Sequence, residues 1–216
     1  MGQRIGPRVR NPSVRYIGEM KNYTASLFLT LGVLALNLFA GSMIGDMTPE
    51  AFAAVNSKGA AAISEIKVTS EPLTKSDEAL LQQIANGGMM QLETSKVAQE
   101  MATRSDVKAF AVAEVKEQRG IGVKLQEIAE AKKIVLPADP DAQVVETVAR
   151  LTALKGAAFD AAYVENIGVK GHENLKATMK RVQAEAKAPE LLAISDAAAP
   201  VIAAHLQVAQ AEAKTE

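Results

Sequence analysis

The chain has 216 residues with 24 basic and 25 acidic side chains, so its net charge near pH 7 is −1. This length suits one folded domain with a targeting segment, and it is short for two ordinary domains. Aromatic residues make up only 4% and tryptophan is absent, which favours packed helices over β-sheets. Because cysteine is absent, disulfides, thiolate metal sites, cysteine nucleophiles and a lipid anchor on cysteine are excluded.

Residues 1–45 have the pattern of an export signal or an N-terminal membrane anchor. Five basic residues come first and are followed by an uncharged run from Asn22 to Gly45. The most apolar part, residues 27–40, has the length of a signal-peptide core and is shorter than the roughly 20 residues of a membrane-spanning helix. The pattern therefore favours a secretory signal.

Small residues at Ala40 and Ser42 predict cleavage before Met43. An uncleaved anchor is the alternative, and Met20 is an alternative start of the chain. In either case the basic flank stays cytoplasmic and the remainder is exported. We therefore expect a periplasmic or outer-envelope protein that contacts the membrane only through this N-terminal segment, if the segment is not cleaved.

The exported part is acidic. Removing residues 1–45 takes away five basic residues and one acidic residue, which leaves 19 basic and 24 acidic residues and a net charge of −5. This argues against nucleic acid as a partner, because phosphates require clustered Lys and Arg. Self-association and an envelope protein partner both stay open.

Residues 46–72 are expected to form a linker with one short helix, which begins at Thr48-Pro49-Glu50. A helical domain follows over residues 73–213. Its first long helix is capped by Thr74 or Ser76 and runs to about residue 103, and its second runs from a Ser105 cap to about residue 133. In both segments apolar or small residues recur every three or four positions, as in helices that face a common core.

The second half of this domain continues the pattern. A proline-containing connection over residues 134–141 leads to a short helix at 142–155, and a long third helix begins after Gly156. The last helix begins at Pro189, and Pro200 predicts a kink or restart within it. The sequence thus predicts an all-α fold, an antiparallel four-helix bundle with an extra short helix before the third long helix.

The chain has only two histidines, and both fall on stripes that are expected to face the core. His205 lies on the apolar face of the last helix, and Gln118 interrupts the apolar stripe of the second helix. The stripe of the third helix contains Leu154, Ala158, Ala161, Val164, Gly168, His172, Leu175, Met179 and Val182.

Four segments carry a resemblance to a known family: GGMMQLETSKVAQEMA at residues 87–102, KAFA at 108–111, FDAAYVENIGVKGHE at 159–173 and PVIAAH at 200–205. They resemble the exported bacterial helical family catalogued as domain of unknown function 4142, over roughly residues 76–210. The resemblance implies a ferritin-like four-helix domain of the periplasm or outer envelope, without an established activity.

The family usually shows a glutamate in the first helix, an Asp-His pair in the second, and one histidine in each of the third and fourth helices. Glu93, His172 and His205 match this pattern, whereas Glu117-Gln118 replaces the Asp-His pair. An amide is a poor ligand for a first-row metal ion, so the replacement weakens any metal site that the family holds.

A di-iron site is disfavoured, because it needs Glu-x-x-His pairs and neither histidine has a glutamate three residues before it. A single divalent ion remains possible, held by His172, His205 and a carboxylate such as Glu93 or Glu114. The expectation that we favour is a metal-free, neutral histidine pair that forms hydrogen bonds with Gln118 or Tyr163. A third interpretation places the histidines at the end of the bundle, where they reach solvent.

Asp160 and Tyr163 are expected to complete this inward polar network, with Asp160 bonded within its own helix. No phosphate-binding loop, nucleophile elbow or zinc-protease motif occurs, so no catalytic residue or organic cofactor is predicted. We expect an exported, non-catalytic helical-bundle domain of the cell envelope. The alternatives are a divalent-metal-binding or redox protein on a ferritin-like scaffold, and a membrane-anchored factor with an unknown partner.

Overall fold

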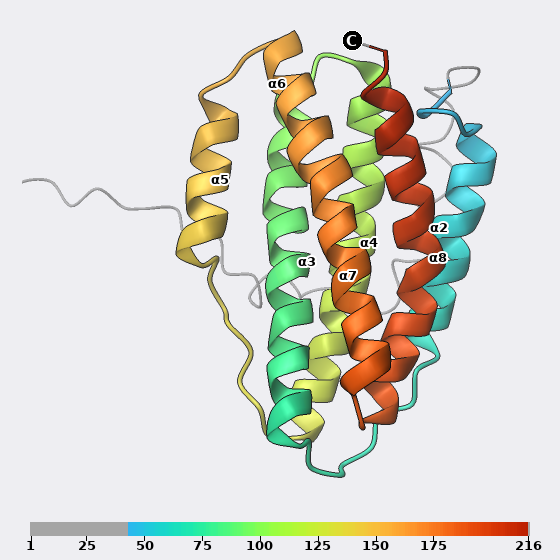
Figure 1. Ribbon diagram of the computed structural model, residues 1–216, viewed down its shortest axis with the longest axis vertical. Coiled ribbons are helices and arrows are strands. Elements are labelled where there is room, and N and C mark those ends of the chain that lie inside the picture. The colour runs from blue at the N-terminus through green and yellow to red at the C-terminus, as the bar shows by residue number, and fades with distance from the viewer. Residues whose placement is uncertain (1–42, 216) are drawn as a thin grey trace, which may run out of the picture.

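The protein is all-helical over the part of the chain that the structure describes. The computed structural model describes residues 43–215, and Figure 1 shows its long helices lying side by side along the long axis. This confirms the all-α fold class. The elements are α2 (Pro49–Ser64), α3 (Lys75–Met101), α4 (Ser105–Ala131), α5 (Ala142–Thr152), α6 (Ala157–Tyr163), the π-helix η3 (Val164–Val169), α7 (Lys170–Glu185) and α8 (Pro189–Glu212).

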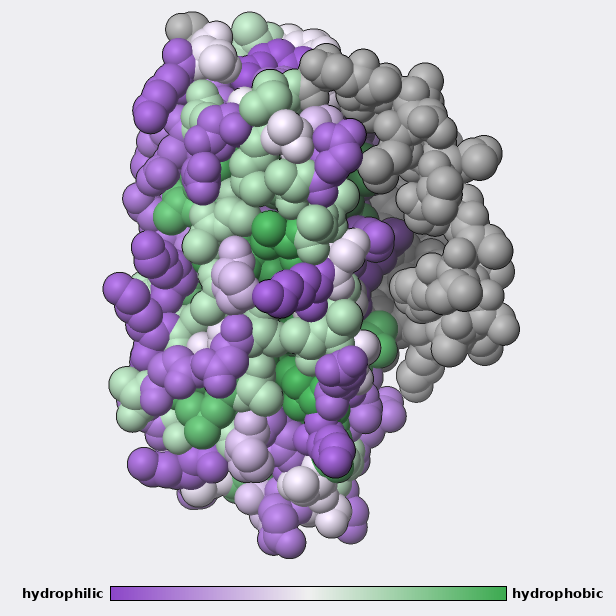
Figure 2. All heavy atoms as spheres, turned by 90° about the vertical axis from the view of Figure 1, so that its right-hand side faces the viewer, coloured by the Kyte–Doolittle hydropathy of each residue, from purple (hydrophilic) through white to green (hydrophobic). Residues whose placement is uncertain are grey.

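Helix α2 occupies most of residues 46–72, the segment expected to be a linker with one short helix. It begins as expected at Thr48, whose hydroxyl accepts a hydrogen bond from the Ala51 amide at 3.2 Å. It is 16 residues long and packs against α8 and α4, with Phe52 only 2% exposed. Its alanine-rich outer side belongs to the face seen in Figure 2, where pale, weakly apolar side chains alternate with hydrophilic ones. Helix α2 is therefore part of the packed helices and not a free tether.

Two capping arrangements set the ends of α3 and α4. Thr74 caps α3, as expected, by accepting a hydrogen bond from the Asp77 amide at 3.1 Å. Ser105 does not cap α4, because Arg104 is the capping position and makes no side-chain cap hydrogen bond. Instead the buried carboxylate of Asp160 accepts hydrogen bonds from the amides of Thr103 and Arg104, each at 3.0 Å. The Asp160 carboxylate thus provides hydrogen-bond acceptors for the free backbone amides at the start of α4. It was expected to bond within its own helix.

Helices α6, η3 and α7 follow one another without a break and form the third long helical rod. The predicted stripe is correct from Val164 to Val182 but wrong before it, because Ala158 is exposed while Phe159, Asp160 and Tyr163 are buried. The reason is η3. A π-helical turn holds more residues than an α-helical turn, so it shifts the buried face by about one position.

Apolar side chains are buried in two main clusters. The first is near the connections at residues 66–73 and 186–188 and contains Leu80, Leu81, Ile128, Leu191 and Ile194, among others. The second contains the aromatic side chains Phe52, Phe110, Phe159 and Tyr163 together with Ile44 and Val208. All four aromatic rings are 2% exposed or less. The buried histidines contact this second cluster.

Helix α8 runs through Pro200 without a break, so the predicted restart is wrong. Proline has no N–H group, so the Asp196 carbonyl one turn earlier receives no hydrogen bond from residue 200. Asp196 and Pro200 are both exposed, so water can reach that carbonyl. By length and hydropathy α8 is the only candidate membrane span among the described residues, and 56% of its most apolar window is buried among the other helices.

Candidate metal centre

Three helices bring Glu114, His172 and His205 together. Glu114 comes from α4, His172 from α7 and His205 from α8, and each is at most 1% exposed. His172 Nε2 lies 2.9 Å from Glu114 Oε1, and His205 Nδ1 contacts the same oxygen. One potential ligand atom from each side chain lies within 4.8 Å of the other two. Among the described residues this is the only group of three or more His and acidic side chains with the geometry to hold a metal ion.

The ring nitrogens that face away from Glu114 are held by oxygen atoms that can only accept hydrogen bonds. His172 Nδ1 donates to the carbonyl oxygen of Gly168 at 2.7 Å. His205 Nε2 donates to Asn56 Oδ1 at 2.7 Å, and the amide group of Asn56 is oriented because its Nδ2 donates to the Phe52 carbonyl at 2.8 Å. Each outer nitrogen therefore carries a hydrogen, and the tautomer of each neutral imidazole is fixed.

The π-helix places the acceptor for His172. A second carbonyl of η3, that of Ile167, lies 3.3 Å from His172 Nδ1 and also accepts a hydrogen bond from Gln91 Nε2 at 3.3 Å. π-helical turns leave carbonyl groups out of the regular α-helical hydrogen-bond pattern, so such groups can accept from side chains. The local departure from α-helix thus orients one of the two histidines.

Aromatic rings cover the histidines. The Phe52 ring centroid lies 4.8 Å from that of His205, and the Phe110 centroid lies 5.4 Å from His205 and 5.7 Å from His172. These rings exclude water from the second apolar cluster and lower the local polarity. Electrostatic interactions within the group are therefore stronger than they would be at the surface.

Burial and mutual attraction have opposite effects on the pKa of Glu114 and on the pKa of His172. Burial alone would raise the pKa of Glu114, but the charges and hydrogen bonds of His172 and His205 outweigh it and hold the pKa below its ordinary value. Burial alone would lower the pKa of His172, but the neighbouring Glu114 carboxylate raises it above the ordinary value. The expectation of neutral histidines holds only if no carboxylate lies beside them, and Glu114 lies beside both rings.

A second carboxylate lies beside this group. Glu117 Oε2 is 3.5 Å from His205 Nδ1, is buried and has no hydrogen-bond partner, and Glu114 Oε2 is also buried without one. Burial raises the pKa of Glu117 to about 7, helped by the Glu114 charge and opposed by His205. Two buried, unpartnered carboxylate oxygens next to two imidazoles are costly unless a proton or a cation joins them.

The other residues expected at the site lie elsewhere. Glu93 is not part of the group and forms an ion pair with Lys96 at 3.0 Å. The hydroxyl of Tyr163 is 2.8 Å from Ser95 Oγ, so Tyr163 bonds to Ser95 and not to a histidine. Gln118 is buried, but the two histidines form their hydrogen bonds with Glu114, Asn56 and backbone carbonyls.

Two residues at the centre were missed. Asn56 lies in the segment expected to be a linker, where alanine and polar residues obscure any stripe. The only signal was its position four residues after Phe52, on the same face of a helix. Glu117 was considered only as part of a replaced sequence pair. Its place beside His205 depends on how α4 and α8 pack.

The family model described as Domain of unknown function (DUF4142) matches residues 64–211, which is more than half of the chain and includes α3 through most of α8. No curated protein and no solved structure matches the chain.

Proposed function

The chain belongs to the DUF4142 family, and from that premise we propose that it is an exported, ferritin-like four-helix domain that binds one divalent transition-metal ion. Glu114, His172 and His205 are the ligands. Export rests on the sequence pattern of residues 1–45, of which residues 1–42 lie outside the described part of the structure. Export and metal binding are independent of each other, because export rests on the sequence of residues 1–45 and metal binding rests on the arrangement of three side chains in the helical domain.

The fixed tautomers carry the metal-binding proposal. With a hydrogen on each outer nitrogen, neutral His172 and His205 point lone pairs toward the Glu114 carboxylate. Three electron-rich atoms then face one another, and a cation between them would relieve their repulsion. Metal-bound histidines commonly donate their other ring N–H to a carbonyl or carboxylate oxygen, as both histidines do here.

The ligand types narrow the choice of metal. Two imidazoles and one carboxylate suit Zn²⁺, Fe²⁺, Co²⁺ and related ions better than Mg²⁺ or Ca²⁺, which prefer oxygen ligands alone. Three protein ligands also leave at least one coordination position for another group. The donor set therefore supports a site for a single first-row transition ion.

A purely structural ion cluster is the second candidate. The Glu114 carboxylate raises the pKa of His172, and the histidines lower that of Glu114. Both directions support protons, in place of a cation, between these groups. In that case the cluster would hold α4, α7 and α8 together without metal. Metal and protons compete for the same lone pairs, so metal affinity is expected to fall as the pH is lowered.

Thermal unfolding with and without metal tests the proposal. The full chain, prepared without chelator, is expected to gain stability when Zn²⁺ or Co²⁺ is added, by about 2.7 kcal/mol at a concentration 100 times the Kd. A chelator should reverse the gain. Glu114→Gln and His205→Leu should abolish it, because each removes a ligand.

Glu93→Gln is the matched control, because Glu93 is a helix carboxylate outside the group and its variant should keep the full gain. A melting temperature that metal and chelator leave unchanged in the parent chain would refute metal binding. It would leave the structural ion cluster as the function of these residues.

A further inference from the structure

Glu117 is a second carboxylate beside the proposed metal ligands, and it is not one of the three. It follows Glu114 by three residues, so both side chains leave the same face of α4. Only 11% of the Glu117 side chain is exposed, and its Oε2 atom is buried without a hydrogen-bond partner. That oxygen lies 3.5 Å from His205 Nδ1, the nitrogen that also contacts Glu114. Two carboxylates of α4 thus approach the same ring nitrogen of α8.

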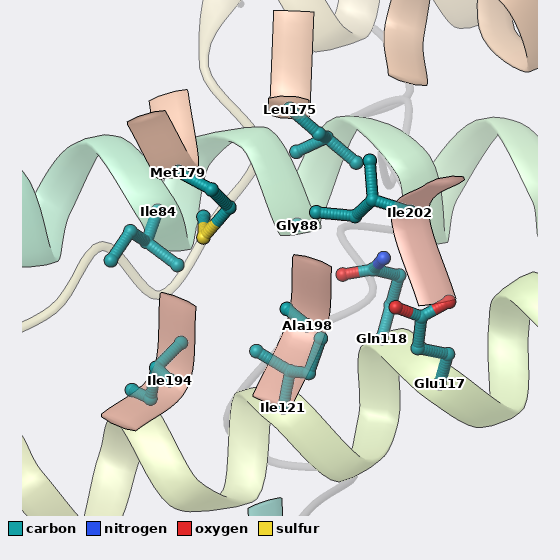
Figure 3. Close-up of a pocket in the computed structure, with 10 residues that line it drawn as sticks. All are labelled: Ile84, Gly88, Glu117, Gln118, Ile121, Leu175, Met179, Ile194, Ala198 and Ile202. Atoms are coloured by element: carbon teal, nitrogen blue, oxygen red, sulfur yellow. The ribbon is translucent and has the colours of Figure 1, made fainter. Parts of the chain in front are cut away.

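The neighbouring Gln118 is directed elsewhere. Figure 3 shows Glu117 and Gln118 side by side at the edge of a small cavity that is otherwise enclosed mainly by aliphatic side chains. A methyl group at Gly88 would lie 3.0 Å from Gln118 Oε1, so the amide faces α3. Glu117 lies beside Ile202, which precedes His205 by one turn of α8. Of this pair, the carboxylate and not the amide is therefore directed toward the histidine.

The distance from Glu117 to His205 suits two ligands of one ion. Bonds of about 2.0 to 2.2 Å at tetrahedral angles place ligand atoms roughly 3.4 Å apart. Glu117 Oε2 and His205 Nδ1 are 3.5 Å apart. Glu117 is outside the group whose ligand atoms all lie within 4.8 Å of one another, so its carboxylate has to turn toward the ion. The side chain can turn because no hydrogen bond holds its Oε2 atom.

The balance of charge favours this movement. A divalent ion bound by two neutral imidazoles and one carboxylate keeps a net positive charge. The rings of Phe52 and Phe110 pack against His205, and a net charge in such apolar surroundings is costly. A second carboxylate on the ion removes the net charge. The same bond gives the buried oxygen of Glu117 the partner that it lacks.

We propose that Glu117 is the fourth protein ligand of the metal ion. The inference rests on the proposed metal site at Glu114, His172 and His205, and it fills the coordination position that these three ligands leave open. Two imidazoles and two carboxylates then close the site. A closed site is typical of structural metal ions, whereas catalytic ions keep a position for water or substrate. The ion therefore serves to hold α4, α7 and α8 together.

Competition for Zn²⁺ between the full chain and a chromophoric chelator tests the inference. Glu117→Gln keeps the shape of the side chain but removes the ligand, and it should weaken Zn²⁺ binding about 100-fold or more, since loss of an outer partner alone commonly costs about 10- to 100-fold. Glu117→His also removes the negative charge but supplies an imidazole, so its affinity should stay within about tenfold of the parent. Glu127→Gln is the matched control, because Glu127 is a half-exposed carboxylate on the same helix and its variant should bind Zn²⁺ as the parent does.

The outcomes separate this inference from the proposed function. If the parent does not bind Zn²⁺, both fail together. If the parent binds Zn²⁺ and Glu117→Gln binds it as tightly as Glu127→Gln does, this inference is wrong while the proposed function stands. Equal losses in Glu117→Gln and Glu117→His would also overturn it, because Glu117 would then act through its charge alone.

Glu117→Asp makes the same distinction if Glu117→His does not fold. Aspartate keeps the charge but is one methylene group shorter, so it does not reach the ion as glutamate does. A loss of Zn²⁺ affinity of about tenfold or more in Glu117→Asp supports a direct bond to the ion. Affinity equal to that of the parent would show that only the charge matters and would refute the inference.

Discussion

Glu114 is the residue on which both histidines depend. Its Oε1 atom faces His172 and His205 together, while its Oε2 atom is buried without a hydrogen-bond partner. For Glu114 to accept a hydrogen bond from each neutral histidine, the ring nitrogen that faces it would have to carry the hydrogen. In both rings that hydrogen is on the other nitrogen, where it is donated to the Gly168 carbonyl or to Asn56 Oδ1. Protons or a cation must therefore be added to the group.

Asn56 is expected to tune metal affinity without touching the metal ion. Asn56→Ala removes the acceptor that fixes the tautomer and ring orientation of His205. Loss of such an outer partner commonly weakens metal binding about 10- to 100-fold. Competition with a chromophoric chelator measures the change, and the exposed neighbour Ser57→Ala is the control. Equal Zn²⁺ affinity in the parent and Asn56→Ala would show that packing alone orients His205.

Glu212 gives a prediction for the pH dependence of stability. Both carboxylate oxygens are buried without a partner, and burial, together with the Asp106 charge, raises its pKa to about 8 against the opposing effect of Arg104. A folded-state pKa above the unfolded value adds stability below about pH 4.5, and this stability is lost as the pH rises through 8. Glu212→Gln should thus unfold like the parent at pH 4 and be more stable than the parent at pH 9, by up to about 5 kcal/mol.

Denaturant unfolding at the two pH values measures this difference. Glu146→Gln is the control, because Glu146 is exposed and pairs with Arg150 at the surface, where ion pairs contribute little. A stabilisation of Glu212→Gln that is the same at pH 4 and pH 9 would contradict the assigned ionisation.

The spacing of residues along each helix predicted burial well. It predicted contacts between side chains of different helices poorly. His172, His205, Glu114 and Gln118 all fall on inward stripes, and all four are buried. Positions 114 and 118 lie one turn apart on one face of α4, about 5 to 6 Å along the helix. Only the packing of α4 against α8 decides that Glu114, and not Gln118, contacts His205. Spacing along one helix cannot supply that choice.

At the scale of elements, three helix starts could be predicted, whereas the way α4 is capped and the presence of the π-helix could not. Thr48, Thr74 and Pro189 mark helix starts because capping hydroxyls and first-turn prolines act locally. The carbonyls of η3 accept from Gln91 of α3 and from His172 of α7. These hydrogen bonds are tertiary, so no local pattern in residues 164–169 identifies the π-helix.

The docking of α2 on α8 is tested at Gly59. A methyl group there would lie 2.2 Å from Val201 Cγ2, and valine has few rotamers with which to move away. Gly59→Ala should therefore destabilise the protein by about 1 to 3 kcal/mol despite the better helix propensity of alanine. Thermal unfolding measures the change.

Gly120→Ala is the matched control for this substitution, because it lies in open space on α4 and should be neutral or stabilising by up to about 1 kcal/mol. If Gly59→Ala were as stable as Gly120→Ala, α2 would not be packed closely on α8 in solution.

At the scale of the whole molecule, the three proposed metal ligands lie inside the range that matches the family model, whereas one of their hydrogen-bond partners lies outside it. Glu114, His172 and His205 lie within residues 64–211, whereas Asn56 and Phe52 precede the matched range. Helix α2 covers His205 with a ring and supplies its acceptor. The surroundings of His205 therefore include α2, a helix whose composition resembles that of a linker.

The last prediction concerns where the mature protein begins after the proposed export. Ile44 is 7% exposed within the second apolar cluster, and Gly45 lies so close to α8 that a methyl group there would be 2.5 Å from the Val208 carbonyl oxygen. Cleavage before Met43 keeps these contacts, whereas a cut after α2 would remove Asn56 and uncover His205. Intact mass of the protein from an extracytoplasmic fraction should therefore correspond to a start at Met43.

A chain that begins at residue 43 and one that begins at residue 66 provide the matched comparison. The longer chain should bind Zn²⁺ with the affinity of the exported protein, because every described contact of the centre is present. The shorter chain should lose at least tenfold in affinity through the missing acceptor of His205, and it should unfold at a lower temperature because apolar surface on α8 and α4 is exposed. An exported protein that begins after residue 64 and still binds Zn²⁺ as tightly would show that α2 is dispensable and that the proposed role of Asn56 is wrong.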